Sequence, residues 1–324
     1  MTNIAIACQG GGSHTAFTAG ALDVMLPWLE SHDCALVGLS GTSGGAVSAT
    51  AAWNGYLDGG AAGACNRLRE IWADVIVSTP FERLLNAWGV AVLEASNAGA
   101  PVPGFSPYTL PWSALGQRRF KRILERHIDF DRFATLADGT APQLVVGTVD
   151  VEAGEFETFR DADVTSDAIL ASAAIPTLFE AVELHGHAHW DGLFSQNPPI
   201  HDLMAVNASR KPDEIWIVQI NPQSVDEVPR SLGDINDRRN ELAGNISLNQ
   251  EVRFIERVND WVAAGELSAD RYKHVEVRKV VLDRRFGLSS KFERSQAFVE
   301  ELMAEGRSVT KTFLDDIEDD LSRD

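Results

Sequence analysis

The chain has 324 residues, 44% of them hydrophobic, which is enough for one large globular domain or two smaller ones. Its formal net charge of −19 argues against nucleic acid and against electrostatic recruitment to anionic membranes, because the phosphates of either would be repelled. No apolar stretch approaches the ~20 residues that cross a bilayer, and the first residues show no secretory signal, so we expect a cytoplasmic protein.

The acidic composition and the cysteines lead to two further expectations. Lysine is scarce beside the excess of acidic residues, and our hypothesis is an adaptation to high salt, where screening removes self-repulsion. The three cysteines, Cys8, Cys34 and Cys65, lack metal-type spacing and are expected to be reduced thiols. We expect neither a metal nor another cofactor.

The first part of the chain predicts two strand–helix units. Residues 3–8 form an apolar run typical of a buried strand, and three glycines and a helical pattern of apolar residues follow. A second strand, residues 35–39, leads into a serine turn and another helix. Two such units in succession predict a mostly parallel sheet with helices on its faces.

Residues 80–112 differ from their surroundings because they are rich in proline, glycine and aromatic side chains. We predict an irregular cap or lid with one short helix near residues 82–94, although a packed surface insertion explains the composition equally well. An amphipathic helix is then expected over residues 118–127, followed by strands at 143–151 and 156–159.

The remaining chain continues the sheet and ends in helices. No repeat or linker requires a second domain, so we expect a single domain over residues 1–324. The expected elements are a short helix at 165–173, strands at 179–184 and 187–190 joined through His185-Gly186, a strand at 214–220, a long helix between Leu242 and Val262, a strand at 274–282, and a helical region from Lys291 that precedes an acidic tail at 315–324.

The pentapeptide Gly41-Thr42-Ser43-Gly44-Gly45 has the G-x-S-x-G pattern between a predicted strand and a predicted helix. A nucleophile elbow needs this context, because glycines at both ends relieve crowding and leave the Ser43 hydroxyl exposed over the end of the sheet. An ordinary Gly/Ser turn is the competing interpretation.

A serine that attacks an acyl carbon needs N–H donors aimed at the carbonyl oxygen, and the three successive glycines after the first strand are suited to this. A dinucleotide-binding loop is an alternative, because Asp33 follows about twenty residues later, but Thr15 replaces the third glycine of that motif. A structural turn is a further alternative. The candidate oxyanion residues are Gly10, Gly11 and Gly12.

The serine also needs a base. Asp191-Gly192 directly follows a predicted strand, and strand ends of parallel sheets are where active sites collect. On local sequence alone, Asp191 is equally well explained as a surface turn residue.

Together these segments resemble the patatin-like lipid acyl hydrolases. The matching motifs are Gln9 to His14, the pentapeptide around Ser43, the run Ala171 to Phe179, and Trp190-Asp191-Gly192. The resemblance covers about residues 3–222 and implies a three-layer α/β/α fold. This segment would be the catalytic core, with the cap at 80–112 and a C-terminal helical and strand extension at about 231–324.

The resemblance also implies a Ser43–Asp191 dyad without histidine, acting on fatty-acyl esters as a phospholipase A or lysophospholipase. Such a protein would meet phospholipid or another lipid ester and would touch a membrane or micelle transiently. Two departures stand out: His14 and Thr15 replace a basic residue and a glycine of the family's first motif, and Leu193 replaces a small residue, which we expect to crowd the turn.

Several histidines offer alternatives. His201 or His274 would complete a Ser-His-Asp esterase triad, and a non-hydrolytic nucleotide-binding protein would use the glycine loop alone. The alternating set His185, His187 and His189 has metal-like geometry, but a solvated strand face is the favoured interpretation. His14 either donates to substrate or is an exposed first-turn residue.

Overall fold

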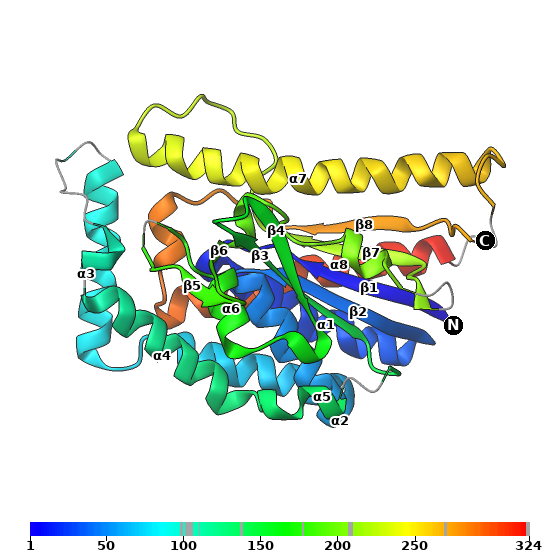
Figure 1. Cartoon of the computed structure of the whole chain (residues 1–324), viewed down its shortest axis with the longest axis horizontal. Helices are drawn as coiled ribbons and strands as arrows, with labels where there is room; N and C mark the ends of the chain where they lie inside the picture. Colours follow the sequence, from blue (N-terminus) through cyan, green and yellow to red (C-terminus); the bar gives the residue numbers. More distant parts are fainter. Residues whose placement is uncertain are drawn as a thin grey trace.

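The structure is a computed structural model that describes residues 1–97, 100, 106–109, 111–136, 139–176, 178–206, 210–268 and 271–321. Within these residues one eight-stranded sheet forms the centre of the molecule (Figure 1). Its order is β5-β6-β3-β2-β1-β7-β8, and β4 also pairs with β3. Parts of the predicted cap, Thr177 and the last three residues lie outside the described residues.

Five neighbouring strands run parallel, from β3 through β2, β1 and β7 to β8, and the short strands at the β3 edge are antiparallel. The mostly parallel sheet predicted from the strand–helix units is therefore confirmed. The strands are β1 (Thr2–Cys8), β2 (Cys34–Thr42), β3 (Gln143–Asp150), β4 (Glu155–Arg160), β5 (Val182–Leu184), β6 (His187–Asp191), β7 (Glu214–Gln219) and β8 (Glu276–Val281).

Successive side chains of the buried strands point to opposite faces of the sheet, so helices pack against both faces and form three layers. In β1, Ile4 and Ile6 pack into the larger core with α1 (Ala16–Ser31), α2 (Gly44–Val75) and α8 (Gln296–Leu321). Ala5 and Ala7 face the opposite core, where α7 (Leu232–Ala263) supplies Leu248, Val252 and Ile255. In Figure 1, α7 crosses one face of the sheet and α2 lies beyond the other. The expected three-layer α/β/α fold is confirmed.

The remaining helices are α3 (Pro80–Asn97), α4 (Pro111–His127), α5 (Phe133–Leu136) and α6 (Ser166–Ser172). The helix predicted at 82–94 is longer than expected, and α3 stands at one end of the molecule beside α4 (Figure 1). The described part of the acidic segment 315–324 forms the last turns of α8. None of the helices in the described ranges is long and apolar enough to span a membrane.

Strand β3 brings the ends of two other strands together. One side of β3 pairs with β4 along residues 145–150. Its other side pairs with β2 as far as Thr42 opposite Gly147, and then with β6 from Asp191 opposite Thr148. Strands β2 and β6 therefore lie end to end along one side of β3, and their carboxyl ends meet between Gly147 and Thr148.

Candidate active site

Ser43 occupies the turn between β2 and α2. Its backbone has φ of 56°, in the left-handed region that non-glycine residues rarely adopt. A side chain at Gly41 would meet the Gly45 backbone at 2.5 Å, and one at Gly45 would meet the Cys8 carbonyl oxygen at 2.2 Å. The two glycines thus allow β1, β2 and α2 to approach closely, as a nucleophile elbow requires.

A second serine fixes this turn. The Ser43 backbone N–H donates to Ser172 Oγ at 2.9 Å, and the Ser172 hydroxyl donates to the Gly147 carbonyl at 2.7 Å. Both serine side chains are buried, and Ser43 is 5% exposed. Ser172 therefore links the strained turn to β3, which holds the Ser43 side chain in one place.

Asp191 ends β6 and is completely buried. Its Oδ1 accepts the Leu193 N–H at 2.9 Å, whereas Oδ2 has no hydrogen-bond partner among the described residues. Burial raises the pKa of the carboxyl to about 7, although the Leu193 amide and the nearby Ser43 hydroxyl act in the opposite direction. The serine is therefore close to the carboxyl without a well-formed hydrogen bond, as is common before substrate binds.

The residues after Asp191 form a short 3-10 helix, Gly192–Phe194. A side chain at Gly192 would meet the Gly147 carbonyl at 2.5 Å, so glycine is needed where this turn touches β3. The Leu193 amide donates to the Asp191 carboxylate in an ordinary helix-capping geometry.

The glycine loop lies beside the elbow, and its three amides are not equivalent. The Gly10 N–H donates to Asn197 Oδ1 at 2.6 Å, and the Gly10 carbonyl accepts from the Asn197 and Asn221 side-chain amides. In the described part of the chain, the Gly11 and Gly12 amides donate to no acceptor. Of the three candidate donors, Gly10 is thus engaged within the protein, and Gly11 and Gly12 are open.

A cavity of about 370 Å³ opens beside Ser43. It is lined mainly by apolar side chains, which suits the hydrocarbon part of a ligand. Its apolar lining includes Val47, Trp72, Val75, Phe120, Ile123, Leu170, Ile175, Phe179 and Phe292, and its polar lining includes Ser13, Thr15, Ser43, Asn86, Gln117, Arg119, Lys291 and Arg294.

A model of the patatin-like phospholipase family matches residues 6–204, more than half of the chain. This chain belongs to the patatin-like phospholipase family. It is therefore a lipid acyl hydrolase. Among solved structures, VipD from Legionella pneumophila is similar with 12% identity and a TM-score of 0.41, over 97% of this chain and 67% of VipD. Comparison with curated proteins gives no match.

His14, at the position where family members carry a basic residue, is an uncharged buried side chain. Its Nε2 lies 2.7 Å from Ser290 Oγ, and its ring packs against Phe286 at 4.8 Å. Burial and the charge of Lys291 lower its pKa to about 3. The alternative of an exposed first-turn residue is wrong, and the ring provides no positive charge to the glycine loop.

The two histidines considered for a triad lie elsewhere. His201 lines a separate hollow together with Glu251 and Phe254 of α7. His274 is largely exposed just before β8, with Nε2 3.7 Å from Glu276. No histidine is among the described residues that line the cavity beside Ser43.

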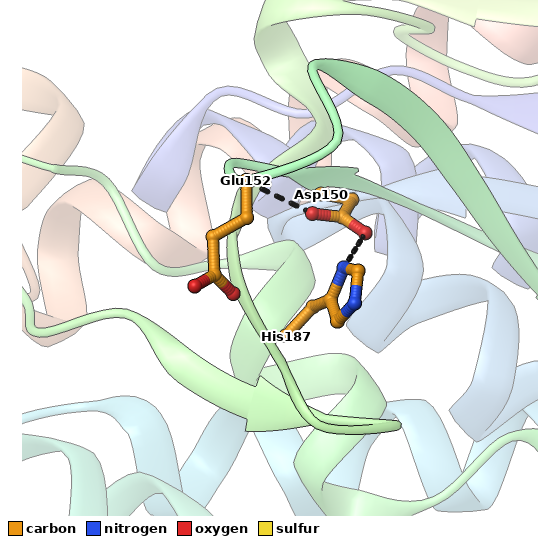
Figure 2. A group of neighbouring side chains, drawn as sticks. All are labelled: Asp150, Glu152 and His187. Carbon is orange, nitrogen blue, oxygen red and sulfur yellow. Dashed lines mark hydrogen bonds and ion pairs between the residues drawn. The ribbon is translucent and has the colours of Figure 1, made fainter.

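The alternating histidines of the β5–β6 hairpin are held by carboxylates. His187 Nδ1 lies 2.6 Å from Asp150 Oδ2, and Asp150 Oδ1 accepts the Glu152 amide (Figure 2). The same Oδ1 also accepts the Ala153 amide. His189 is fully buried, with Nε2 2.6 Å from Glu157. The solvated-face interpretation is therefore wrong for His189.

Two groups in this hairpin have the spacing of metal ligands. They are Asp150 with Glu152 and His187, and Asp150 with Glu157 and His189, with ligand atoms within 4.8 Å of one another. Figure 2 shows the first group, in which the His187 ring is directed at Asp150. Because two backbone amides and the His187 imidazole already bond the Asp150 oxygens, the protein itself satisfies this carboxylate.

Sequence reasoning missed the polar residues that support the site. Gln9 is fully buried, and its Oε1 accepts the Ile220 and Asn221 amides, which joins the glycine loop to the end of β7. Its Nε2 donates to the Asn197 carbonyl and to Asn245. The only sequence signal for such a role is the position of Gln9 directly after a strand and before glycines.

Proposed function

We propose that this protein hydrolyses fatty-acyl esters through a Ser43–Asp191 dyad. The observation that carries the proposal is the buried Asp191 Oδ2, which has no hydrogen-bond partner among the described residues and lies beside Ser43, where β2 and β6 meet. A carboxyl whose pKa is about 7 is a much better match to general-base catalysis at neutral pH than an ordinary aspartate.

In the first step, Ser43 Oγ attacks the ester carbonyl carbon while Asp191 Oδ2 takes the hydroxyl proton. The open Gly11 and Gly12 amides donate to the oxyanion, and Asn197 holds Gly10 so that the loop keeps its shape. Collapse of the tetrahedral intermediate expels the alcohol, which receives the proton from Asp191. Asp191 then takes a proton from water, which attacks the acyl-serine carbonyl. Collapse of this second tetrahedral intermediate releases the fatty acid, and Asp191 returns the proton to Ser43 Oγ.

The cavity supports a hydrocarbon substrate. Its apolar walls begin at the elbow, so an acyl chain bound there has its carbonyl carbon at Ser43. Phospholipid, lysophospholipid and other lipid esters all fit this arrangement, which supports an activity of phospholipase A or lysophospholipase type. Residues 80–112 contribute Asn86 to the wall, which is consistent with a cap over the site.

An exposed apolar stripe on α3 supports transient contact with a membrane or micelle. Phe81, Leu84, Leu85 and Trp88 follow helical spacing, and at least half of each residue's surface is exposed. The same helix lines the cavity through Asn86, so lipid that contacts the stripe is next to the catalytic site. Hydrophobic contact of this kind is compatible with the net charge of −19.

Labelling with a fluorophosphonate tests the proposal. Wild-type protein should be modified at Ser43, as located by peptide mass spectrometry, and Ser43→Ala should be neither labelled nor active on a 4-nitrophenyl ester. Ser48→Ala is the matched control, because this buried hydroxyl has no hydrogen-bond partner among the described residues and lies outside the cavity lining. Folded wild-type protein that resists the probe would contradict the proposal.

A further inference from the structure

Three cationic side chains line the cavity, in a protein that is acidic overall. Lys291 Nζ lies 2.5 Å from Asp237, and Arg119 lies 2.8 Å from Glu82. Arg294 differs from both. Among the described residues, its guanidinium forms no hydrogen bond and no ion pair.

The backbone on either side of Arg294 is firmly held. The Arg294 N–H donates to Asn86 Oδ1 at 3.0 Å, and its carbonyl accepts the Val77 N–H at 3.0 Å. The Asn86 side-chain amide also donates to the Phe292 carbonyl at 2.8 Å. These bonds join the segment to α3 and to the end of α2, so the guanidinium extends from a fixed point in the cavity wall.

The surroundings of this guanidinium favour an anion. Arg294 is half-buried, and burial together with the Arg119 charge lowers its pKa. Glu82 is nearby, but its carboxylate already accepts from Arg119 and from the Ser78 and Thr79 amides. Glu293 accepts the Ser295 amide. The charges of Glu82 and Glu293 partly offset this lowering of the pKa, but neither carboxylate forms an ion pair with Arg294. A partly desolvated cation without an ion-pair partner is unfavourable unless a ligand supplies the opposite charge.

We propose that Arg294 binds an anionic group, carboxylate or phosphate, carried by the ester substrate. The ester carbonyl lies at Ser43, the hydrocarbon lies along the apolar wall, and the anion meets the planar guanidinium in a charge-assisted hydrogen bond. This inference rests on the proposed hydrolysis at Ser43. It adds a preference for acidic lipid esters over neutral ones of the same length, determined by a residue beyond the family match at 6–204.

Two substrate pairs distinguish the source of the anion. The first compares the mono-4-nitrophenyl ester of a medium-chain diacid with its methyl-capped neutral analogue, which places the anion on the acyl chain. The second compares lysophosphatidate with a monoacylglycerol of the same acyl chain, which places it on the head group. The quantity measured is the ratio of kcat/KM for the anionic and the neutral member of each pair.

In Arg294→Gln, the ratio should fall about 10- to 100-fold for the substrate pair whose anion reaches Arg294 in the wild type, because a hydrogen bond to a charged group is lost. The ratio for the other pair should not change. Hydrolysis of the neutral ester should stay within about twofold, and Arg294→Lys should retain part of the preference. Arg118→Gln is the matched control, since Arg118 is exposed on α4 outside the cavity lining and should leave both ratios unchanged.

A structural role predicts a different pattern. If Arg294 only supported the fold, its loss would lower the melting temperature and reduce the hydrolysis rates of the anionic and neutral esters together. Removal of a cation without an ion-pair partner should instead maintain or raise the melting temperature. Unchanged ratios with active neutral-ester hydrolysis would overturn the assignment of Arg294 alone. Wild-type protein that hydrolyses none of the four esters would overturn the proposed function and this inference with it.

Discussion

The carboxyl groups of Asp191 and Glu251 lie at different sites, and both are buried, but the residues around them differ. Burial raises the pKa of both Asp191 and Glu251 to about 7. Each has one oxygen bonded to backbone N–H groups, from Leu193 in one case and from Ile200 and His201 in the other. Each also leaves its second oxygen without a partner among the described residues.

The difference lies in the neighbours. Asp191 is beside Ser43, which has a strained backbone and lines the apolar cavity. Glu251 borders the hollow below α7, where the Ser247 hydroxyl donates to a carbonyl oxygen instead. The raised pKa is therefore a consequence of burial at both sites. Of the two carboxyls, only Asp191 has, among the described residues, a serine hydroxyl beside it from which it can take a proton as a general base.

Neutralising the two carboxyls should produce the largest contrast. We expect Asp191→Asn to reduce ester hydrolysis about 1,000-fold or more, because an amide cannot accept the Ser43 proton. Glu251→Gln should leave kcat within about twofold. Both variants are measured on a soluble 4-nitrophenyl ester, with circular dichroism as the control for folding. Equal losses in the two would show that Asp191 acts only through its burial.

The pH profile sharpens the same comparison. The base must be deprotonated, so kcat/KM should fall about tenfold per pH unit below a midpoint near 7 and level off above it. Glu251→Gln should keep this midpoint, since the Glu251 carboxyl titrates outside the catalytic cavity. A flat profile between pH 5 and pH 8 would contradict the assignment of Asp191 as base.

In stability, the two residues should behave alike. Their folded-state pKa lies above the ordinary values of 3.8 and 4.5, so their stabilising contribution is complete below about pH 4 and is lost as the pH rises through 7. At pH 8, Asp191→Asn and Glu251→Gln should each increase the free energy of unfolding by about 1–3 kcal/mol. Urea unfolding at pH 4 and pH 8 measures this, and a gain at pH 4 as large as at pH 8 would point to a different cause.

The smallest effect is expected at the exposed α3 stripe. Leu84→Glu combined with Trp88→Glu should reduce activity on phospholipid vesicles about fivefold to tenfold, because apolar contact with the lipid is lost. Activity on the soluble ester should not change. Ile246→Glu on α7 is the matched control, since Ile246 is also at least half exposed but lies on another helix. A parallel loss on both substrates would argue against an interfacial role.

The sequence was sufficient for local features and insufficient for long-range polar contacts. Short patterns predicted β1, the glycine loop and the elbow, because each depends on neighbouring residues. Asn197 and Ser172 act on Gly10 and Ser43 across more than 100 residues, and no local pattern specifies such pairs. The extent of α3 was also missed, since its apolar stripe is exposed rather than packed in the core.

The end-to-end arrangement of β2 and β6 along β3 places Ser43 and Asp191 at strand ends of the sheet, whereas part of the cavity wall comes from helices α3 and α4. Ser43 and Asp191 depend on three strands, whereas α3 and α4 are inserted between β2 and β3 in the chain. Exchange of residues 80–127 between relatives should therefore change the part of the cavity wall that α3 and α4 supply and leave the reaction itself in place.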